Sequence, residues 1–146
     1  MRTLKQLIIE KLASYEELSF MDMQDKTNLR ASIDRPLGYK HGKKGMHKME
    51  FNINYGNFPK LINPADGEPW DVVIPGIHKS EKKIKVGKII GMVPMRNGNH
   101  KLIGLPKGHT FTDKHKDQVK EYISRKRNQE VINNEPRHMS EEYMSF

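Results

Sequence analysis

The chain contains Asn54-Tyr55-Gly56-Asn57-Phe58-Pro59, followed shortly by Asn63-Pro64-Ala65-Asp66-Gly67-Glu68-Pro69-Trp70-Asp71-Val72-Val73-Ile74. Both segments are rich in residues that favour turns, and the second one ends in an apolar run. Gly67 permits backbone angles that a side chain would forbid, and Pro69 fixes its own φ. We therefore expect a turn-rich loop that leads directly into a strand over residues 71–74.

Three carboxylates lie within six positions of this loop, at Asp66, Glu68 and Asp71. Such groups repel one another unless cations lie between them, and carboxylate oxygens are the ligands that hard ions such as Mg²⁺ prefer. Asp71 begins a strand, so a rigid element would hold its side chain. The spacing alone also fits a plainer interpretation, because Asp-Gly is a common turn dipeptide and acids before a strand are usually solvated.

The bulk composition narrows the class of protein. A chain of 146 residues predicts one domain, and its mean hydropathy of -0.81 is low, although the apolar residues cluster in the middle. There are no cysteines, which excludes disulfides, thiolate zinc sites and a cysteine nucleophile. No apolar run approaches the roughly 18 residues of a membrane span, and the first residues lack the apolar core of a signal peptide, so we expect a cytoplasmic protein without membrane contact.

Short apolar patterns along the chain predict a small, mainly antiparallel β-barrel. Strands are expected over residues 29–33, 49–55, 71–74, 84–95 and 100–105, with a hairpin turn at 96–99. Leu4, Leu7, Ile8 and Leu12 predict an amphipathic N-terminal helix that covers the sheet or makes a homo-oligomer contact. A second helix is expected over residues 113–128, followed by a mobile tail.

A basic stretch precedes the strand expected at 49–55. Residues 39–48 include four lysines and two histidines, and the formal net charge of +8 favours an anionic partner. A run of charge is by default a solvated face. Lysines beside a metal-bound polyphosphate would instead neutralise the charge that the metals leave over.

The acidic loop resembles the signature D-G-D-P-x-D of soluble family I inorganic pyrophosphatases, and Tyr55-Gly56-Asn57-Phe58-Pro59 resembles the upstream Y-G-F-I-P of that family. The likeness extends from Ile33-Asp34-Arg35-Pro36-Leu37-Gly38 to Lys101-Leu102-Ile103-Gly104-Leu105-Pro106, about half of the chain, and the chain looks like the short pyrophosphatase-like branch. It implies an α+β fold with an OB-like, pyrophosphatase-type barrel. We expect an N-terminal helix and connector over residues 1–28, the barrel with its C-terminal helix over 29–128, and the tail over 129–146.

The resemblance also implies Mg²⁺-dependent hydrolysis of pyrophosphate or a related phosphoanhydride by metal-activated water, with Mn²⁺ as the alternative ion. Asp66 and Asp71 would hold metals, and Asp34 matches a position that ligates through water. Glu68 would orient or deprotonate the attacking water, and Tyr55 would bond a phosphate oxygen. Four lysines would bind the substrate, namely Lys40, Lys43, Lys44 and Lys101.

Two departures from the family pattern favour weak activity. Glu68 replaces an aspartate, and its extra methylene shifts the carboxylate by roughly 1.5 Å. The hairpin Arg96-Asn97-Gly98-Asn99-His100 contains no acid, whereas the family carries two metal-binding aspartates there. Fewer carboxylates imply fewer metals or weaker metal binding.

Two other functions also fit the sequence. A metal-poor relative would bind a nucleotide, polyphosphate or RNA through the basic stretch without turnover. A purely nucleic-acid-binding protein would use the net charge and the run Arg125-Lys126-Arg127, although cations in a last helical turn also complement the helix dipole. Few aromatic residues interleave with the basic ones, so nucleic acid is the least favoured partner.

Overall fold

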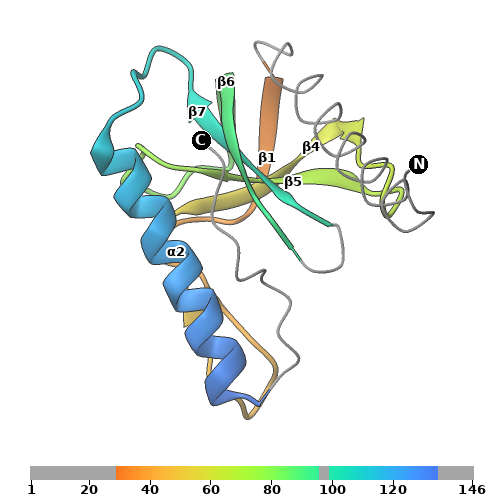
Figure 1. Ribbon diagram of the computed structural model, residues 1–146, viewed down its shortest axis with the longest axis vertical. Coiled ribbons are helices and arrows are strands. Elements are labelled where there is room, and N and C mark those ends of the chain that lie inside the picture. The colour runs from red at the N-terminus through yellow and green to blue at the C-terminus, as the bar shows by residue number, and fades with distance from the viewer. Residues whose placement is uncertain (1–28, 96–98, 135–146) are drawn as a thin grey trace, which may run out of the picture.

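The computed structural model describes residues 29–95 and 99–134. Five of its strands close into a barrel in the order β1-β4-β5-β7-β6 (Figure 1). These strands are β1 (Leu29–Arg35), β4 (Asn54–Ile62), β5 (Pro69–Ile74), β6 (Lys83–Val93) and β7 (Lys101–Pro106). All neighbouring pairs are antiparallel except β5 and β7, which run parallel. The expected small, mainly antiparallel barrel is therefore confirmed.

The segment from Asn54 to Pro59 is a strand, and the expectation of a turn-rich loop there is wrong. Gly56 lies opposite Ile33 of β1, and a Cβ on Gly56 would collide with the backbone oxygen of Ser32. The glycine thus serves a close approach of two strands rather than a turn. Pro59 follows the last regular pair with β5, inside a register shift, so its missing N–H breaks no regular ladder. The loop begins only after Ile62.

The strand expected over 49–55 is divided between two sheets. Met49–Glu50 forms β3, which pairs with β2 (Lys40–His41) in a separate two-stranded sheet, whereas Asn54 already belongs to β4. The alternation still reports burial correctly, because Phe51, Ile53 and Tyr55 all face inward. The segment pairs with β2 at its start and with β1 and β5 further on, so one alternating sequence pattern spans two strands.

Two apolar clusters hold the barrel and the helix together. The first cluster fills the barrel and includes Phe58, Trp70, Val72 and Leu102. The second lies under the helix α2 (Asp113–Ile132), where Tyr55 and Val73 pack with Tyr122. β7 is buried along its whole length, which explains its continuous apolar sequence.

Helix α2 extends four residues beyond the end expected at Asn128, because its last turn makes specific polar contacts. The Gln129 side-chain amide donates hydrogen bonds to the backbone oxygens of His41 (2.8 Å) and His47 (3.2 Å). Asn133 exchanges two more bonds with the His47 backbone. These contacts fix the β2–β3 hairpin along the C-terminal half of α2 (Figure 1).

The expected N-terminal helix, the hairpin turn at 96–98 and the tail beyond residue 134 lie outside the described residues. Within the described ranges, no helix is long and apolar enough to cross a membrane.

Candidate functional site

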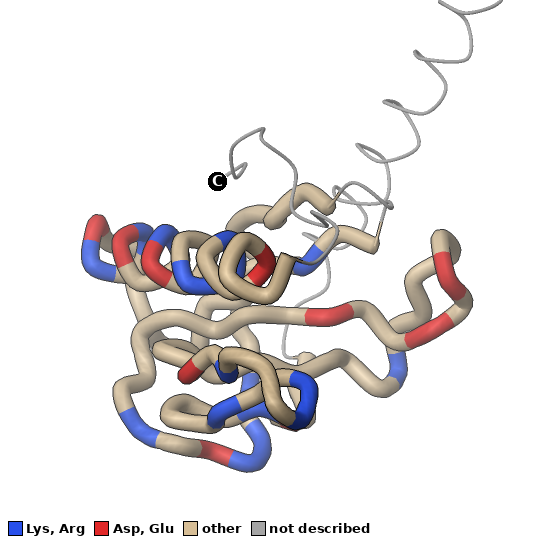
Figure 2. The backbone as a smooth tube through the Cα atoms, turned by 90° about the horizontal axis from the view of Figure 1, so that it is seen from below, with Lys and Arg blue, Asp and Glu red and all other residues tan. Residues whose placement is uncertain are grey.

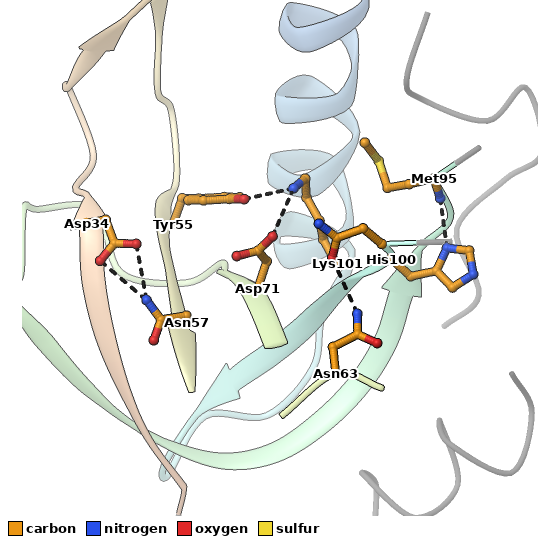
Figure 3. Close-up of polar contacts among 9 residues, drawn as sticks. Asp34, Tyr55, Asn57, Asn63, Asp71, Met95, His100 and Lys101 are labelled. Atoms are coloured by element: carbon orange, nitrogen blue, oxygen red, sulfur yellow. Dashed lines mark hydrogen bonds and ion pairs between the residues drawn. The ribbon is translucent and has the colours of Figure 1, made fainter. Parts of the chain in front are cut away.

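Two parallel strands place an acid and a base side by side at one end of the barrel. Val72 of β5 pairs with Leu102 of β7, so the residues before them, Asp71 and Lys101, lie on neighbouring strands. Lys101 Nζ lies 3.4 Å from Asp71 Oδ2 and donates a 2.7 Å hydrogen bond to the Tyr55 hydroxyl (Figure 3). The side chains of Lys101 and Asp71 are 11% and 24% exposed. We call Tyr55, Asp71 and Lys101 the Lys101 cluster.

The Tyr55 phenol is held in its protonated form. Burial raises the pKa of Tyr55 well above its ordinary value, and the negative charge of Asp71 raises it further. Because Lys101 donates to the phenolic oxygen, the phenolic hydrogen is left for an acceptor such as Asp71 or a phosphate oxygen. The cluster therefore offers two donors and one carboxylate.

A small pocket of about 220 Å³ opens beside the cluster. Its lining includes three cationic side chains, those of Arg35, Lys101 and Lys126. The Arg35 guanidinium lies over the Tyr55 ring, 5.2 Å from the centroid, which orients it against the pocket wall. The other lining residues are Phe51, Tyr55, Met95, Asn99 and Tyr122. With Asp71 as the neighbouring acid, the pocket carries an excess of positive charge and suits a small anion.

The acidic loop between β4 and β5 is shaped by Asn63. The backbone N–H of Asn63 donates to Glu68 O at 2.7 Å, and its side-chain oxygen accepts from Ala65 N at 2.9 Å. Gly67 has φ +73, as its turn position requires, and Asp66 Oδ1 accepts a hydrogen bond from the Glu68 backbone. Asp66 and Glu68 are exposed, whereas Asp71 is held on β5. Hydrogen bonds within the loop therefore hold its conformation.

The expected metal ligands do not form a metal site in the described ranges. No group of three or more histidines, aspartates and glutamates among the described residues is arranged to hold an ion. Asp34 accepts from Asn57 at 3.2 and 3.4 Å, and Asp71 pairs with Lys101. Carboxylates suit Mg²⁺ by their chemistry, and this ion is usually bound by one or two carboxylates together with substrate phosphates rather than by a cage of protein ligands.

The acid-free hairpin is described only from Asn99. Asn99 Oδ1 accepts from Asn63 Nδ2 at 3.3 Å, and His100 Nδ1 accepts from Met95 N at 2.8 Å (Figure 3). These side chains connect the hairpin base to the acidic loop and to the end of β6. Asn97 lies outside the described residues.

The lysines of the basic stretch lie apart from the cluster. Lys40 is exposed on β2, and Lys43 and Lys44 are exposed near the tip of the β2–β3 hairpin. The hairpin lies along the C-terminal half of α2, away from the barrel (Figure 1). Of the four lysines expected to bind substrate, the structure places only Lys101 in the pocket.

Three pocket residues that carry a charge or a hydroxyl group were missed by the sequence analysis, namely Arg35, Tyr122 and Lys126. Arg35 directly follows Asp34, and strand alternation would have turned its side chain to the opposite face. Tyr122 lies within the helix expected over residues 113–128, where a buried tyrosine is ordinarily a packing residue, and Lys126 follows it by one helical turn. A search for cations one turn from a buried tyrosine would have found Lys126.

The basic run Arg125-Lys126-Arg127 lies before the last turn of α2, which contains no basic residue, and it does not form a basic face. Arg125 pairs with Glu121 at 2.9 Å and donates to Glu50 O at 3.0 Å. Figure 2 shows charges of both signs interleaved along this helix. This mixture disfavours α2 as a nucleic-acid interface.

Comparison with known proteins identifies the type of fold. No protein-family model matches the chain, and no curated protein matches its sequence. Among solved structures, an inorganic pyrophosphatase from Neisseria gonorrhoeae is similar over 81% of this chain and 82% of its own, with a TM-score of 0.57 and 15% identity. The inorganic pyrophosphatase from Thermus thermophilus is similar over 76% of this chain and 77% of its own, with a TM-score of 0.54 and 14% identity. The chain therefore has a pyrophosphatase-type fold.

Proposed function

We propose that this protein binds inorganic pyrophosphate or a related phosphoanhydride in the pocket beside the Lys101 cluster and hydrolyses it in the presence of Mg²⁺. The observation that carries the proposal is the partly buried group of Lys101, Asp71 and Tyr55, open to a pocket with three cations. The pyrophosphatase-type fold supports the same activity at the level of architecture.

The pocket favours a small, highly charged anion. Its volume of about 220 Å³ lies below the roughly 300–1,000 Å³ typical of drug-sized ligand sites. Lys101 and Arg35 would contact phosphate oxygens, and charge-assisted hydrogen bonds of this kind are roughly twice as strong as neutral ones. Pyrophosphate therefore suits the pocket better than a whole nucleotide.

The chain's own donors would stabilise charge that develops on the phosphate groups. Lys101 is held by Asp71 and Tyr55, so little reorganisation is needed when substrate binds. The protonated Tyr55 would donate to a phosphate oxygen, and Asp71 would accept a proton or orient water. Mg²⁺, when bound with the substrate, would supply charge neutralisation.

The test is release of inorganic phosphate from pyrophosphate by the full chain, with and without Mg²⁺, beside a panel of nucleoside di- and triphosphates. We expect Mg²⁺-dependent release that is fastest with pyrophosphate. Asp71→Asn should abolish most of it, and Asp113→Asn, at an exposed acid in the first turn of α2, is the matched control. No release from any phosphoanhydride at any Mg²⁺ concentration would contradict the hydrolytic part of the proposal.

A second candidate is binding of a polyphosphate, nucleotide or RNA without turnover. It is favoured by the arrangement of the acids, because no three ligands converge among the described residues and Asp71 is already paired with Lys101. Calorimetric binding of pyrophosphate without phosphate release would support this candidate. Steep weakening with salt would indicate many phosphate contacts and a longer polyanion.

A further inference from the structure

The wall of the barrel opens between the first residues of β1 and the last residues of β4. Figure 1 shows the start of β1 between β6 and β4. The regular pairing of β1 with β4 ends at Ser32 and Asn57, so Leu29 to Ala31 pair with β6 and lie beyond the last pair with β4. After Asn57, β4 pairs with β5 through a register shift between Phe58 and Ile62. A groove of about 640 Å³ lies at this opening and is lined by β1, β4 and β6.

The groove combines apolar side chains with exposed cations. Ala31 and Phe58 are 0% and 1% exposed and belong to the apolar cluster that fills the barrel. Leu29 and Leu61 also line the groove and pack against that cluster while partly exposed. Four exposed cations line the groove as well, and its described lining contains no acid: Arg30, Lys60, Lys83 and Lys85. An acidic partner with an apolar face would therefore complement both parts of this surface.

The cations at this opening crowd one another. Arg30 of β1 lies opposite Lys85 of β6, and the backbone N–H of Lys107 donates to Lys85 O at 2.9 Å. The side chain of Lys107 lowers the pKa of Lys85, and the charge of Arg30 adds to this shift. Like charges placed directly opposite on neighbouring strands destabilise a sheet. Carboxylates brought to this edge of the groove would relieve the repulsion.

The part of the chain directly before β1 has the complementary composition. Residues 10–25 contain five acids and one lysine, a formal charge of −4, whereas the four cations of the groove carry +4. Leu12, Tyr15 and Leu18 are spaced three residues apart, so a helix would carry all three on one face. Three residues separate this segment from Leu29, which lines the groove. The acids of the segment are Glu10, Glu16, Glu17, Asp22 and Asp25.

We propose that residues 10–25 dock in the groove of their own chain, with apolar side chains on its floor and acids at its cations. An amphipathic helix laid into an apolar groove is a common mode of recognition. Because the segment is joined to β1, docking is intramolecular, with an effective concentration on the order of millimolar. The docked segment would cover the opening in the barrel wall. Docking does not depend on hydrolysis, so failure of the hydrolytic proposal would leave this one intact.

The groove suits a nucleic acid less well than it suits this segment. Proteins that bind single strands stack the bases on exposed aromatic side chains. Phe58 is the aromatic residue of the lining, and it is 1% exposed, so its ring offers no face to a base. The apolar floor therefore favours aliphatic and aromatic side chains of a peptide.

The experiment is paramagnetic relaxation in the NMR spectrum of the full chain. The chain has no cysteine, so Ser19→Cys gives a single attachment site for a nitroxide spin label within the docking segment. A diamagnetic label at the same site supplies the reference spectrum. We expect the nitroxide to broaden the amide resonances of groove residues that are distant from position 19 in the sequence, namely Lys60, Leu61, Lys83 and Lys85.

Charge reversal tests whether the acids of the segment and the cations of the groove meet. Lys83→Glu with Lys85→Glu should remove most of the broadening at Lys60 and Leu61, because the groove then repels the segment. Adding Glu16→Lys with Glu17→Lys to that variant should restore it. Lys114→Glu with Lys120→Glu, at two exposed lysines of α2, is the matched control and should leave the broadening unchanged.

A mixture of chains separates docking within one chain from docking between two. Spin-labelled chain is mixed with isotope-labelled chain that carries no nitroxide, and we expect no broadening of the groove resonances in the second chain. Broadening there would mean that a second copy fills the groove, and it would overturn the proposal. The proposal is also overturned if the spin-labelled chain shows no broadening at the groove, if charge reversal leaves the broadening unchanged, or if a single-stranded oligonucleotide alone shifts the groove resonances.

Discussion

Lys101 and the lysines of the β2–β3 hairpin carry the same charge in opposite surroundings. Lys101 is nearly buried, paired with Asp71 and bonded to Tyr55 at 2.7 Å. Lys43 and Lys44 are exposed in a hairpin that is fixed to α2 by backbone and amide groups rather than by its lysines. A held, poorly solvated cation acts strongly at short range, whereas an exposed one is screened by salt. The position of a lysine in the fold, and not the number of lysines near it in the sequence, therefore determines how strongly it can act on a bound anion.

The largest expected effect comes from Lys101→Met, which keeps the apolar stem and removes the charge. Phosphate release should fall by about 100-fold or more in kcat/KM, because a fixed donor at the reacting oxygens is lost and Asp71 loses its counter-charge. Lys43→Met is the matched control and should change kcat/KM by less than about twofold. Equal losses in the two variants, measured by steady-state phosphate release, would remove the distinction between the two regions.

Tyr55→Phe tests the burial of the Lys101 cluster through the pH dependence of stability. Tyr55 has its pKa raised by burial and by Asp71, so the folded chain keeps a proton that the unfolded chain loses near pH 10. The unfolded state then binds fewer protons, and the free energy of unfolding of the parent should fall as pH rises above about 10. The variant lacks this proton, so its thermal unfolding temperature should fall less steeply between about pH 9 and 11. Parallel curves for both chains would show that the phenol is not buried as described.

Asn97→Asp combined with Asn99→Asp adds negative charge to the acid-free hairpin, whose Asn99 lines the pocket. Asp at 99 retains an oxygen that accepts from Asn63, so the local bond is conserved. The Mg²⁺ concentration for half-maximal activity should fall by about two- to fivefold, because carboxylates bind this ion better than amides do. Titration of activity with Mg²⁺ measures the change, and an unaltered midpoint would show that the acid-free hairpin does not limit metal binding.

Lys43→Ala with Lys44→Ala should give the smallest effect. The unfolding temperature should stay nearly unchanged, since neither residue is buried, and pyrophosphate affinity should weaken by less than about twofold at low salt. Calorimetry at low and high salt separates this long-range attraction from direct contact. A tenfold loss that persists at high salt would mean that the hairpin reaches the substrate.

The barrel could be predicted from the sequence because burial alternates along its strands. The alternation at Phe51, Ile53 and Tyr55 identified the buried face of the segment correctly, although the pairing partner changes along it. Gly56 and Pro59 misled the prediction, since both residues are typical of turns and only the neighbouring strand β1 explains the glycine. Local preference cannot reveal a close approach between residues far apart in the sequence.

The site was less predictable than the fold for a related reason. Asp71 and Lys101 were each identified separately, but their contact depends on the parallel pairing of β5 and β7 across 30 residues. Lys43 and Lys44 were grouped with them by sequence order, between Asp34 and Tyr55. The hydrogen bonds of Gln129 to the hairpin, which determine where those lysines lie, come from the other end of the described chain.

The parallel pair also has a consequence for the order of folding. β6 and β7 are joined by a hairpin, and β4 and β5 by a short loop, so both antiparallel pairs can form early from local contacts. The β5–β7 pairing must then join two preformed units, which makes it a slow, non-local step. Asp71 meets Lys101 only at that step, so the ability to bind anion should appear at the end of refolding, after most of the secondary structure has formed.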